Sequence, residues 1–151
     1  MKLADLKVGS EWRSSPREMT RERMRWYVDA QPTVAVDNGR IQTQEPTIHD
    51  DDNYAKKQGL PGIIADGMIS TNWIMGLLID TFGQEFIYRG KLRTKYIAPI
   101  YEDHVVIACA KIASVVANAD GETVYGVEVW CEDDTGKKLT VGDAVIHARP
   151  G

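Results

Sequence analysis

The distribution of apolar residues divides the chain near residue 86, with helical patterns before this point and strand patterns after it. The most apolar segment runs from Met68 to Phe82 and is apolar on nearly every side of a helix. Such a helix belongs in the core, because none of its sides suits water. At about 16 residues it would be about 24 Å long. Gly67 opens this segment and Gly83 ends it.

Two shorter helices are predicted before the apolar one. Thr20 precedes a charged, amphipathic run, which is typical of an N-cap and predicts a helix over about Thr20–Ala30 that Pro32 stops. Asp51–Gln58 has acidic residues at its start and lysines at its end, the polarity that suits the helix macrodipole. Gly59 would close this second helix.

Residues 31–43 are expected to form an inserted hairpin or loop between these two helices. Two short apolar runs, Thr33–Val36 and Ile41–Thr43, flank the sequence Asp37-Asn38-Gly39-Arg40. Asn-Gly between short apolar runs is typical of a hairpin or a tight turn.

After Phe86 the sequence predicts four strands separated by turns, several of them rich in Asp and Gly. The predicted strands are Ile87–Tyr96, Val105–Ala117, Thr123–Glu132 and Lys138–Ala148. A buried helix followed by an antiparallel sheet indicates an α+β fold in which the sheet wraps the helix.

Length and composition predict one small soluble domain. The chain has 151 residues, of which 43% are hydrophobic and 26% charged, enough for a single core. Its formal net charge of -4 argues against nucleic acid or an anionic membrane as a partner, since both require a basic patch. A local basic cluster could still bind a small ligand that carries phosphate.

The cytoplasm is the expected location. No stretch reaches the roughly 18–20 consecutive apolar residues of a membrane span, and residues 1–7 lack the apolar run of a signal peptide. Cys109 and Cys131 lie in predicted strands and are not spaced like metal ligands. They are expected to be buried, reduced thiols, because a disulfide does not fit this compartment.

The segment Thr47–Met68 carries most of the chemical information. Here the sequence resembles the MaoC-like dehydratases, which include the R-specific enoyl-CoA hydratases. The matching residues are Ile48-His49, Ala55, Gly59 and Gly67-Met68. Farther along, Lys95–Asp103 resembles the family's strand and its proline-containing turn. The resemblance covers about residues 47–148.

The resemblance implies a hot-dog fold, a homodimer, and an acyl thioester of coenzyme A or a carrier protein as the ligand, with no further cofactor. The family's reaction is the syn addition of water to a 2-enoyl thioester, or the reverse. This reaction needs a base for water, an acid for the α-carbon and a donor for the thioester oxygen. We therefore predict a lyase of the hydratase or dehydratase type.

Two residues match the family's catalytic positions. His49 would transfer the proton, and the alternative is a histidine that only forms hydrogen bonds in a loop. The Gly67 N–H would stabilise the thioester oxygen, because the first N–H groups of a helix lack partners within it and lie at its positive end. The alternative for Gly67 is a glycine needed only for tight entry into the helix.

The family's catalytic aspartate, five residues before the histidine, is replaced here by Gln44. Asp66, where the family has a histidine, or Glu45 is expected to supply the missing carboxylate, and Asp37 in the predicted hairpin is a third candidate. A simple helix cap is the alternative role for Asp66. The acidic run of residues 50–52 is more typical of a solvated helix start than of a catalytic cluster.

The family analogy also indicates where the ligand would bind. The acyl-pocket candidates, for which core packing is the alternative, are Tyr54, Met68, Trp73 and Met75. The residues that alternate along the first predicted strand, and so share one face, are Arg89, Lys91, Arg93 and Lys95. Arg93 and Lys95 are expected to bind phosphate, and a charged, solvated strand face is the alternative.

A metal site is not expected, because no second histidine lies at ligand spacing from His49, and His104 and His147 fall in distant strands. Two other functions stay open. One is a thioesterase of the same fold, in which a carboxylate activates water against the carbonyl. The other is a non-catalytic acyl-CoA-binding or partner subunit.

Overall fold

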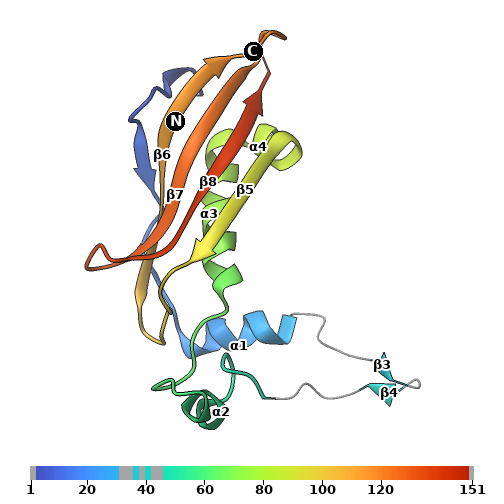
Figure 1. Cartoon of the computed structure of the whole chain (residues 1–151), viewed down its shortest axis with the longest axis vertical. Helices are drawn as coiled ribbons and strands as arrows, with labels where there is room; N and C mark the ends of the chain where they lie inside the picture. The colour runs from blue at the N-terminus through green and yellow to red at the C-terminus, as the bar shows by residue number, and fades with distance from the viewer. Residues whose placement is uncertain (1–2, 31–35, 38–39, 42–45, 150–151) are drawn as a thin grey trace. The chain divides into compact units, whose positions relative to one another are not determined.

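The computed structural model describes residues 3–30, 36–37, 40–41 and 46–149 (Figure 1). The chain divides into two compact units. The first comprises Met1–Arg17, Gly67–Ala98 and Val105–Gly151, and the second comprises Glu18–Asp66 and Pro99–His104. That the chain forms one domain with an inserted hairpin stays a prediction.

The first unit is built on an antiparallel sheet with the strand order β1-β6-β7-β8-β5. The two-residue strand β2 (Arg17–Glu18) also pairs with β6. The remaining strands are β1 (Glu11–Arg13), β5 (Gly90–Tyr96), β6 (Val105–Ala117), β7 (Thr123–Asp133) and β8 (Lys138–Ala148). The three longest strands, β6 to β8, start and end within one residue of their predicted bounds.

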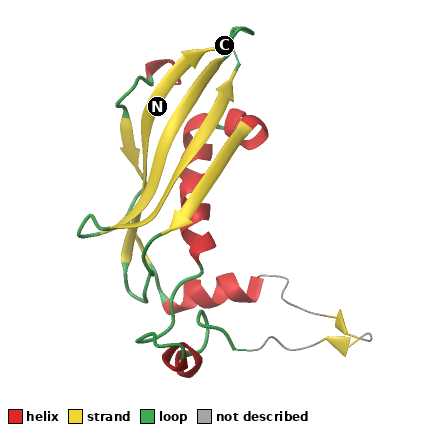
Figure 2. Cartoon of the chain, viewed as in Figure 1, coloured by secondary structure: helices red, strands yellow, loops and turns green. Residues whose placement is uncertain are grey.

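The apolar helix α3 (Gly67–Phe82) lies along one face of this sheet (Figures 1 and 2). Ile74 and Leu78 of the helix are fully buried. Cys131 of β7 faces the helix, since its Sγ lies 3.6 Å from the Ser70 carbonyl oxygen. A helix packed on an antiparallel sheet confirms the predicted α+β class.

The prediction that the apolar helix is buried in the core holds for only one side of α3. Met68 and Met75 are 42% and 36% exposed, and Asn72 between them is exposed as well. The sheet covers only one side of the helix, so apolar side chains remain on the other. Within the described residues, no helix is long and apolar enough to cross a membrane.

The strand predicted from Ile87 onward is wrong over its first three residues. They belong to the short helix α4 (Gln84–Arg89), and β5 begins only at Gly90. Phe86 is buried, whereas Ile87 and Tyr88 are 55% and 77% exposed, so the apolar run does not mark a covered strand face. A Cβ atom at Gly90 would lie 2.4 Å from the Phe86 ring, so glycine lets this ring pack there.

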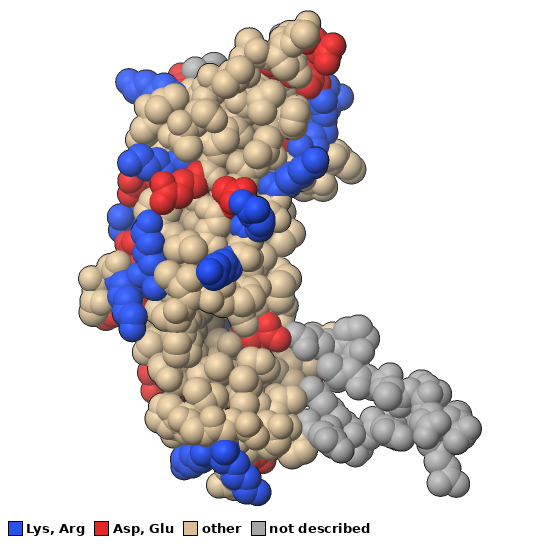
Figure 3. Space-filling model, viewed as in Figure 1, with Lys and Arg blue, Asp and Glu red and all other residues tan. Residues whose placement is uncertain are grey.

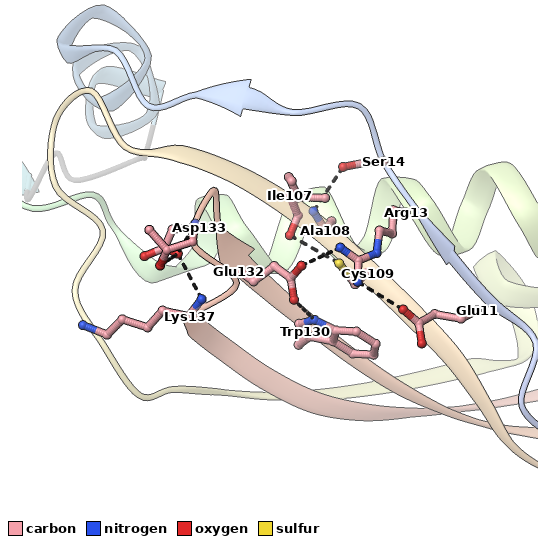
Figure 4. A network of polar contacts seen from close by, with 11 residues as sticks. Glu11, Arg13, Ser14, Ile107, Ala108, Cys109, Trp130, Glu132, Asp133 and Lys137 are labelled. Atoms are coloured by element: carbon pink, nitrogen blue, oxygen red, sulfur yellow. Dashed lines mark hydrogen bonds and ion pairs between the residues drawn. The ribbon is translucent and has the colours of Figure 1, made fainter.

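The sequence does not predict β1, because three residues are too few to show a period. A short 3-10 helix, Leu3–Asp5, precedes it. Figure 4 shows how β1 is attached: Arg13 Nη1 donates to Glu132 Oε1 at 2.6 Å, and Trp130 Nε1 donates to Glu132 Oε2 at 2.6 Å. Glu132 is only 7% exposed, and a buried carboxylate requires such donors.

The second unit contains α1 (Arg21–Ala30), α2 (Asp52–Lys57) and a two-stranded pair, β3 (Val36–Asp37) and β4 (Arg40–Ile41). Both helices begin within one residue of their predicted starts. Thr20 Oγ1 accepts the Arg23 N–H at 3.2 Å, which is the expected N-cap bond. Of the predicted hairpin, residues 31–35, 38–39 and 42–43 lie outside the described residues.

The two cysteines are buried free thiols, as predicted. Burial raises the pKa of Cys109 to about 11 and the pKa of Cys131 to about 12. Both thiols therefore stay protonated near neutral pH and are poor nucleophiles.

Glu122 in the turn between β6 and β7 gives a test of the fold. Hydrogen bonds from Arg89, and then from Asn118, lower the pKa of the Glu122 carboxyl. The charged carboxylate therefore stabilises the folded state above its unfolded pKa of about 4.3, and this stabilisation is lost as the pH falls through the folded pKa. We expect Glu122→Gln to lower the free energy of unfolding at pH 7 and much less at pH 3, measured by denaturant titration.

The matched control is Glu128→Gln, at an exposed position of β7. An equal loss of stability at both pH values for Glu122→Gln would contradict the proposed role of the Glu122 charge.

Candidate functional site

His49 lies in the turn that precedes α2, in the second unit. Its Nδ1 lies 2.9 Å from the carbonyl oxygen of Ile64. A carbonyl can only accept, so Nδ1 carries the proton and neutral His49 keeps the lone pair on Nε2. The Ile64 N–H in turn donates to the Ile48 carbonyl at 3.0 Å. The imidazole is thus fixed by backbone groups in one tautomer, as a residue that accepts a proton at Nε2 requires.

The acidic residues beside His49 all have structural partners. Asp50 Oδ1 accepts the N–H and hydroxyl of Thr47 at 2.7 and 3.1 Å, and the Thr47 hydroxyl oxygen accepts the His49 N–H at 3.1 Å. Asp51 caps α2 by accepting the Tyr54 N–H at 2.7 Å. These bonds shape the turn and favour the structural interpretation of the acidic run over a catalytic one.

Asp52 connects the His49 turn to Arg21, a residue that the sequence does not single out. Arg21 Nη1 donates to Asp52 Oδ2 at 2.8 Å, and Arg21 also donates to both carboxylate oxygens of Glu102 at 2.6–3.1 Å. These bonds raise the pKa of Arg21 and lower that of Asp52. Asp52 Oδ1 accepts the Ile63 N–H at 3.1 Å, next to the Ile64 carbonyl that holds His49. Arg21 is therefore connected through Asp52 to the segment whose carbonyl binds the imidazole.

A pocket of about 550 Å³ opens beside this turn within the second unit. His49 and Tyr54 both line it, together with the apolar side chains Ile48, Leu60 and Ile64. The structure thus brings together two of the predicted site residues, one for proton transfer and one for acyl binding. A largely apolar pocket with a few polar groups is the usual form of a small-molecule site.

Gly67 is the first residue of α3, in the first unit. A Cβ atom at this position would lie 2.7 Å from three carbon atoms of the Tyr96 ring. The Tyr96 hydroxyl lies 3.0 Å from Thr71 Oγ1 and donates to Met68 Sδ at 3.2 Å. Glycine therefore allows an aromatic ring to lie against the helix start, where N–H groups lack partners within the helix.

Solved structures establish the fold to which these features belong. The MaoC-like dehydratase from Rhodospirillum rubrum aligns with a TM-score of 0.75 at 14% identity, covering 100% of this chain and 99% of that chain. The R-hydratase PhaJ1 from Pseudomonas aeruginosa aligns with a TM-score of 0.73 at 15% identity, covering 98% and 85%. The chain has the hot-dog fold of these proteins.

A third hot-dog structure is the 3R-hydroxyacyl-ACP dehydratase complex HadBC from Mycobacterium tuberculosis, with a TM-score of 0.68 at 17% identity. It covers 93% of this chain and 96% of that chain. No model of a protein family matches the sequence, and no curated protein matches it. At identities this low, the likeness establishes the hot-dog fold alone.

The carboxylate that would assist His49 stays a prediction. Asp66 is half-buried and directly precedes Gly67 in the chain. Gln44 and Glu45 lie outside the described residues, as does the side chain of Asp37.

The other acyl-pocket candidates lie on α3, in the first unit. Met68 and Met75 lie on its exposed side. Trp73 is half-buried, with the Arg17 guanidinium 5.5 Å from its ring centre. This cation–π contact was not predicted from the sequence, since Arg17 and Trp73 are far apart in the chain.

The prediction that four basic residues alternate along one strand is wrong for the first of them, Arg89. Arg89 belongs to α4 and forms an ion pair with Glu122, whereas Lys91, Arg93 and Lys95 are exposed on β5. Arg93 lies 2.8 Å from Asp143 on β8 and is 84% exposed, so this pair is weak and Arg93 could exchange it for a phosphate. Figure 3 shows basic and acidic side chains interleaved over the strands.

Among the described residues, no group of three or more His, Cys, Asp or Glu side chains is placed to hold a metal ion. The carboxylates nearest to His49 in the sequence bind N–H and hydroxyl groups or Arg21 instead.

The contact between Gly67 and Tyr96 predicts a non-additive pair of substitutions. We expect Gly67→Ala to lower the free energy of unfolding by about 1–3 kcal/mol, because the new methyl group forces the ring away from its place. In a Tyr96→Ala background the same substitution should cost much less. Denaturant unfolding of the four variants in the cycle measures the difference.

Gly76→Ala is the matched control, because a Cβ atom there meets nothing within 4 Å. Equal costs of Gly67→Ala in both backgrounds would show that Tyr96 does not impose the requirement for glycine.

Proposed function

We propose that this hot-dog protein is a lyase that adds water to a 2-enoyl thioester, or removes water from a 3-hydroxyacyl thioester. The thiol would be coenzyme A or the arm of a carrier protein. The observation that carries the proposal is the hydrogen bond from His49 Nδ1 to the Ile64 carbonyl, beside a pocket lined by apolar side chains. A neutral imidazole held in this tautomer beside an open pocket has Nε2 free to accept a proton from water.

In the hydration direction, Nε2 of His49 takes a proton from water, and the oxygen of that water bonds to the β-carbon. The double-bond electrons move toward the thioester, whose oxygen gains negative charge. The Gly67 N–H would stabilise this oxygen as a donor at the positive end of α3. A second proton-transfer group then gives a proton to the α-carbon, which completes the addition of water, and the proton held by His49 restores that group for the next turnover.

The second proton-transfer group is proposed to be Asp66 or Glu45. The acidic residues 50–52 are weaker candidates, because each already accepts hydrogen bonds: Asp50 from Thr47, Asp51 from the Tyr54 N–H, and Asp52 from Arg21 and the Ile63 N–H. Asp66 also neighbours the proposed oxygen-binding N–H in the chain.

The acyl-binding residues are part of the proposal. Tyr54 lines the His49 pocket and would contact the acyl group there. Met68, Trp73 and Met75 of α3 are the other proposed acyl-binding residues. Arg93 and Lys95, both exposed on β5, would bind the phosphates of coenzyme A or a carrier arm.

A homodimer is part of the proposal. Three large side chains on one part of the first unit, Met68, Met75 and Tyr96, are 36–47% exposed. Apolar surface of this kind favours association. One similar structure, HadBC, is itself a complex.

The test is incubation of the protein with enoyl-, 3-hydroxyacyl- and saturated acyl-CoA. We expect interconversion of the first two without release of free thiol. His49→Asn should lower kcat by about 10²–10⁴-fold, the usual contribution of a proton-transfer residue. Product chromatography and a thiol reagent measure the two outcomes.

His147→Asn is the matched control, since His147 lies on β8 beside Glu122 and has no role in the proposal. We also compare Asp66→Asn with Glu45→Gln. The substitution that lowers kcat identifies the second proton-transfer group. If Gln44→Asp creates activity that the native chain lacks, position 44 is not used natively.

Free thiol from saturated acyl-CoA would indicate a thioesterase. Binding without turnover, unchanged by His49→Asn, would indicate a non-catalytic subunit.

A further inference from the structure

Arg21, the first residue of α1, connects this helix to two other segments of the second unit. We propose that Arg21 is a positioning residue for His49. Its two carboxylate partners, Asp52 and Glu102, belong to the segments that bind the backbone on either side of Ile64. The Ile64 carbonyl in turn keeps the imidazole of His49 in the tautomer that can accept a proton at Nε2. The consequence for catalysis rests on the proposed function, whereas the consequence for the tautomer does not.

The first connection runs through Asp52, at the start of α2. Arg21 Nη1 donates to Asp52 Oδ2 at 2.8 Å, and the other carboxylate oxygen, Oδ1, accepts the Ile63 N–H at 3.1 Å. Space is tight at this contact, since a Cβ atom at Gly62 would lie 3.2 Å from the same Oδ1. The carboxylate of Asp52 therefore fixes the backbone one residue before Ile64, and the guanidinium of Arg21 orients this carboxylate.

The second connection runs through the segment that carries Glu102. Arg21 donates to both carboxylate oxygens of Glu102 at 2.6–3.1 Å, and a bidentate pair of this kind fixes orientation as well as distance. In the same segment, the Ile100 carbonyl accepts the Ala65 N–H at 2.8 Å. The backbone one residue after Ile64 is thus bound to a segment that Arg21 also holds.

Arg21 is itself attached at a fixed point of the second unit. Two residues earlier, the Met19 side chain is fully buried. The Met19 N–H donates to the His104 carbonyl at 2.8 Å, and the Met19 carbonyl accepts the Asp103 N–H at 2.9 Å. The start of α1 is therefore anchored by packing and by backbone bonds, which is the support that a positioning side chain needs.

The arrangement of charges gives Arg21 more influence than an ordinary surface ion pair. The Arg21 side chain is 41% exposed, and an isolated pair at such a position contributes little to stability. Here, however, one guanidinium binds two carboxylates. Without its positive charge, Asp52 and Glu102 would repel each other and draw apart the segments that flank Ile64. The acceptor of the His49 Nδ1–H lies between these segments.

The experiment combines NMR of the His49 imidazole with kinetics of Arg21→Gln, both in the full chain. A neutral imidazole in water favours the Nε2–H tautomer, so displacement of the Ile64 carbonyl should return His49 toward that form. We expect the two imidazole nitrogen resonances of His49, assigned by their loss in His49→Asn, to report this change. In the proposed reaction, kcat should fall by up to about 10²-fold. KM should change little, since the described residues that line the pocket do not include Arg21.

Arg25→Gln is the matched control, because it removes the same charge from an exposed position one turn farther along α1. It should leave the tautomer and kcat unchanged. Arg21→Lys keeps the positive charge but cannot donate to Glu102 in the same parallel geometry, so it should shift the tautomer in the same direction by less. If Arg21→Gln does not fold, Arg21→Lys decides.

An unchanged His49 tautomer in the folded Arg21 variant would overturn the positioning role, whether or not the chain is a lyase. Equal changes in Arg25→Gln would overturn it as well, because they would show an effect of net charge alone. A shifted tautomer in a chain without hydratase activity would support the positioning role and reject the proposed function.

Discussion

The apolar surface of α3 is the constraint on which the first unit depends, because this helix cannot be exposed to water on the side that carries Ile74 and Leu78. The sheet of β6, β7 and β8 covers that side with alternating apolar residues. Each large side chain buried in this way contributes roughly 1.5–3 kcal/mol. The position of the helix start, and so of the Gly67 N–H, follows from this packing and from the Tyr96 ring against it.

The chemistry proposed for the second unit depends on a smaller set of bonds. The pairing of Ile48 with Ile64 brings a carbonyl to His49 Nδ1, and that carbonyl decides which imidazole nitrogen can accept a proton. Arg21 supports the arrangement through Asp52, which binds the Ile63 N–H. The imidazole of His49 is therefore oriented by a main-chain carbonyl, in a turn that the Arg21–Asp52 ion pair helps to hold.

Sequence patterns were informative where a period extends over many residues. The strands β6 to β8 and the helix α3 follow from alternation and from a long apolar run. The helix α4 could not be predicted from the sequence pattern. Ile87 and Tyr88 resemble the start of a strand, but both side chains are exposed. β1 is too short to have a period, and its attachment depends on an Arg13–Glu132 pair separated by 119 residues.

The sequence by itself determined the α+β class, the central helix and the buried thiols, since these depend on local periodicity and on residue types at short spacing. The tertiary structure decided the tautomer of His49, the bonds of Arg21 to Asp52 and Glu102, and the helical place of Arg89. Each of these depends on contacts between residues distant in the chain. Such contacts leave no local pattern, because hydrogen bonds and ion pairs form wherever folding brings a donor and an acceptor together.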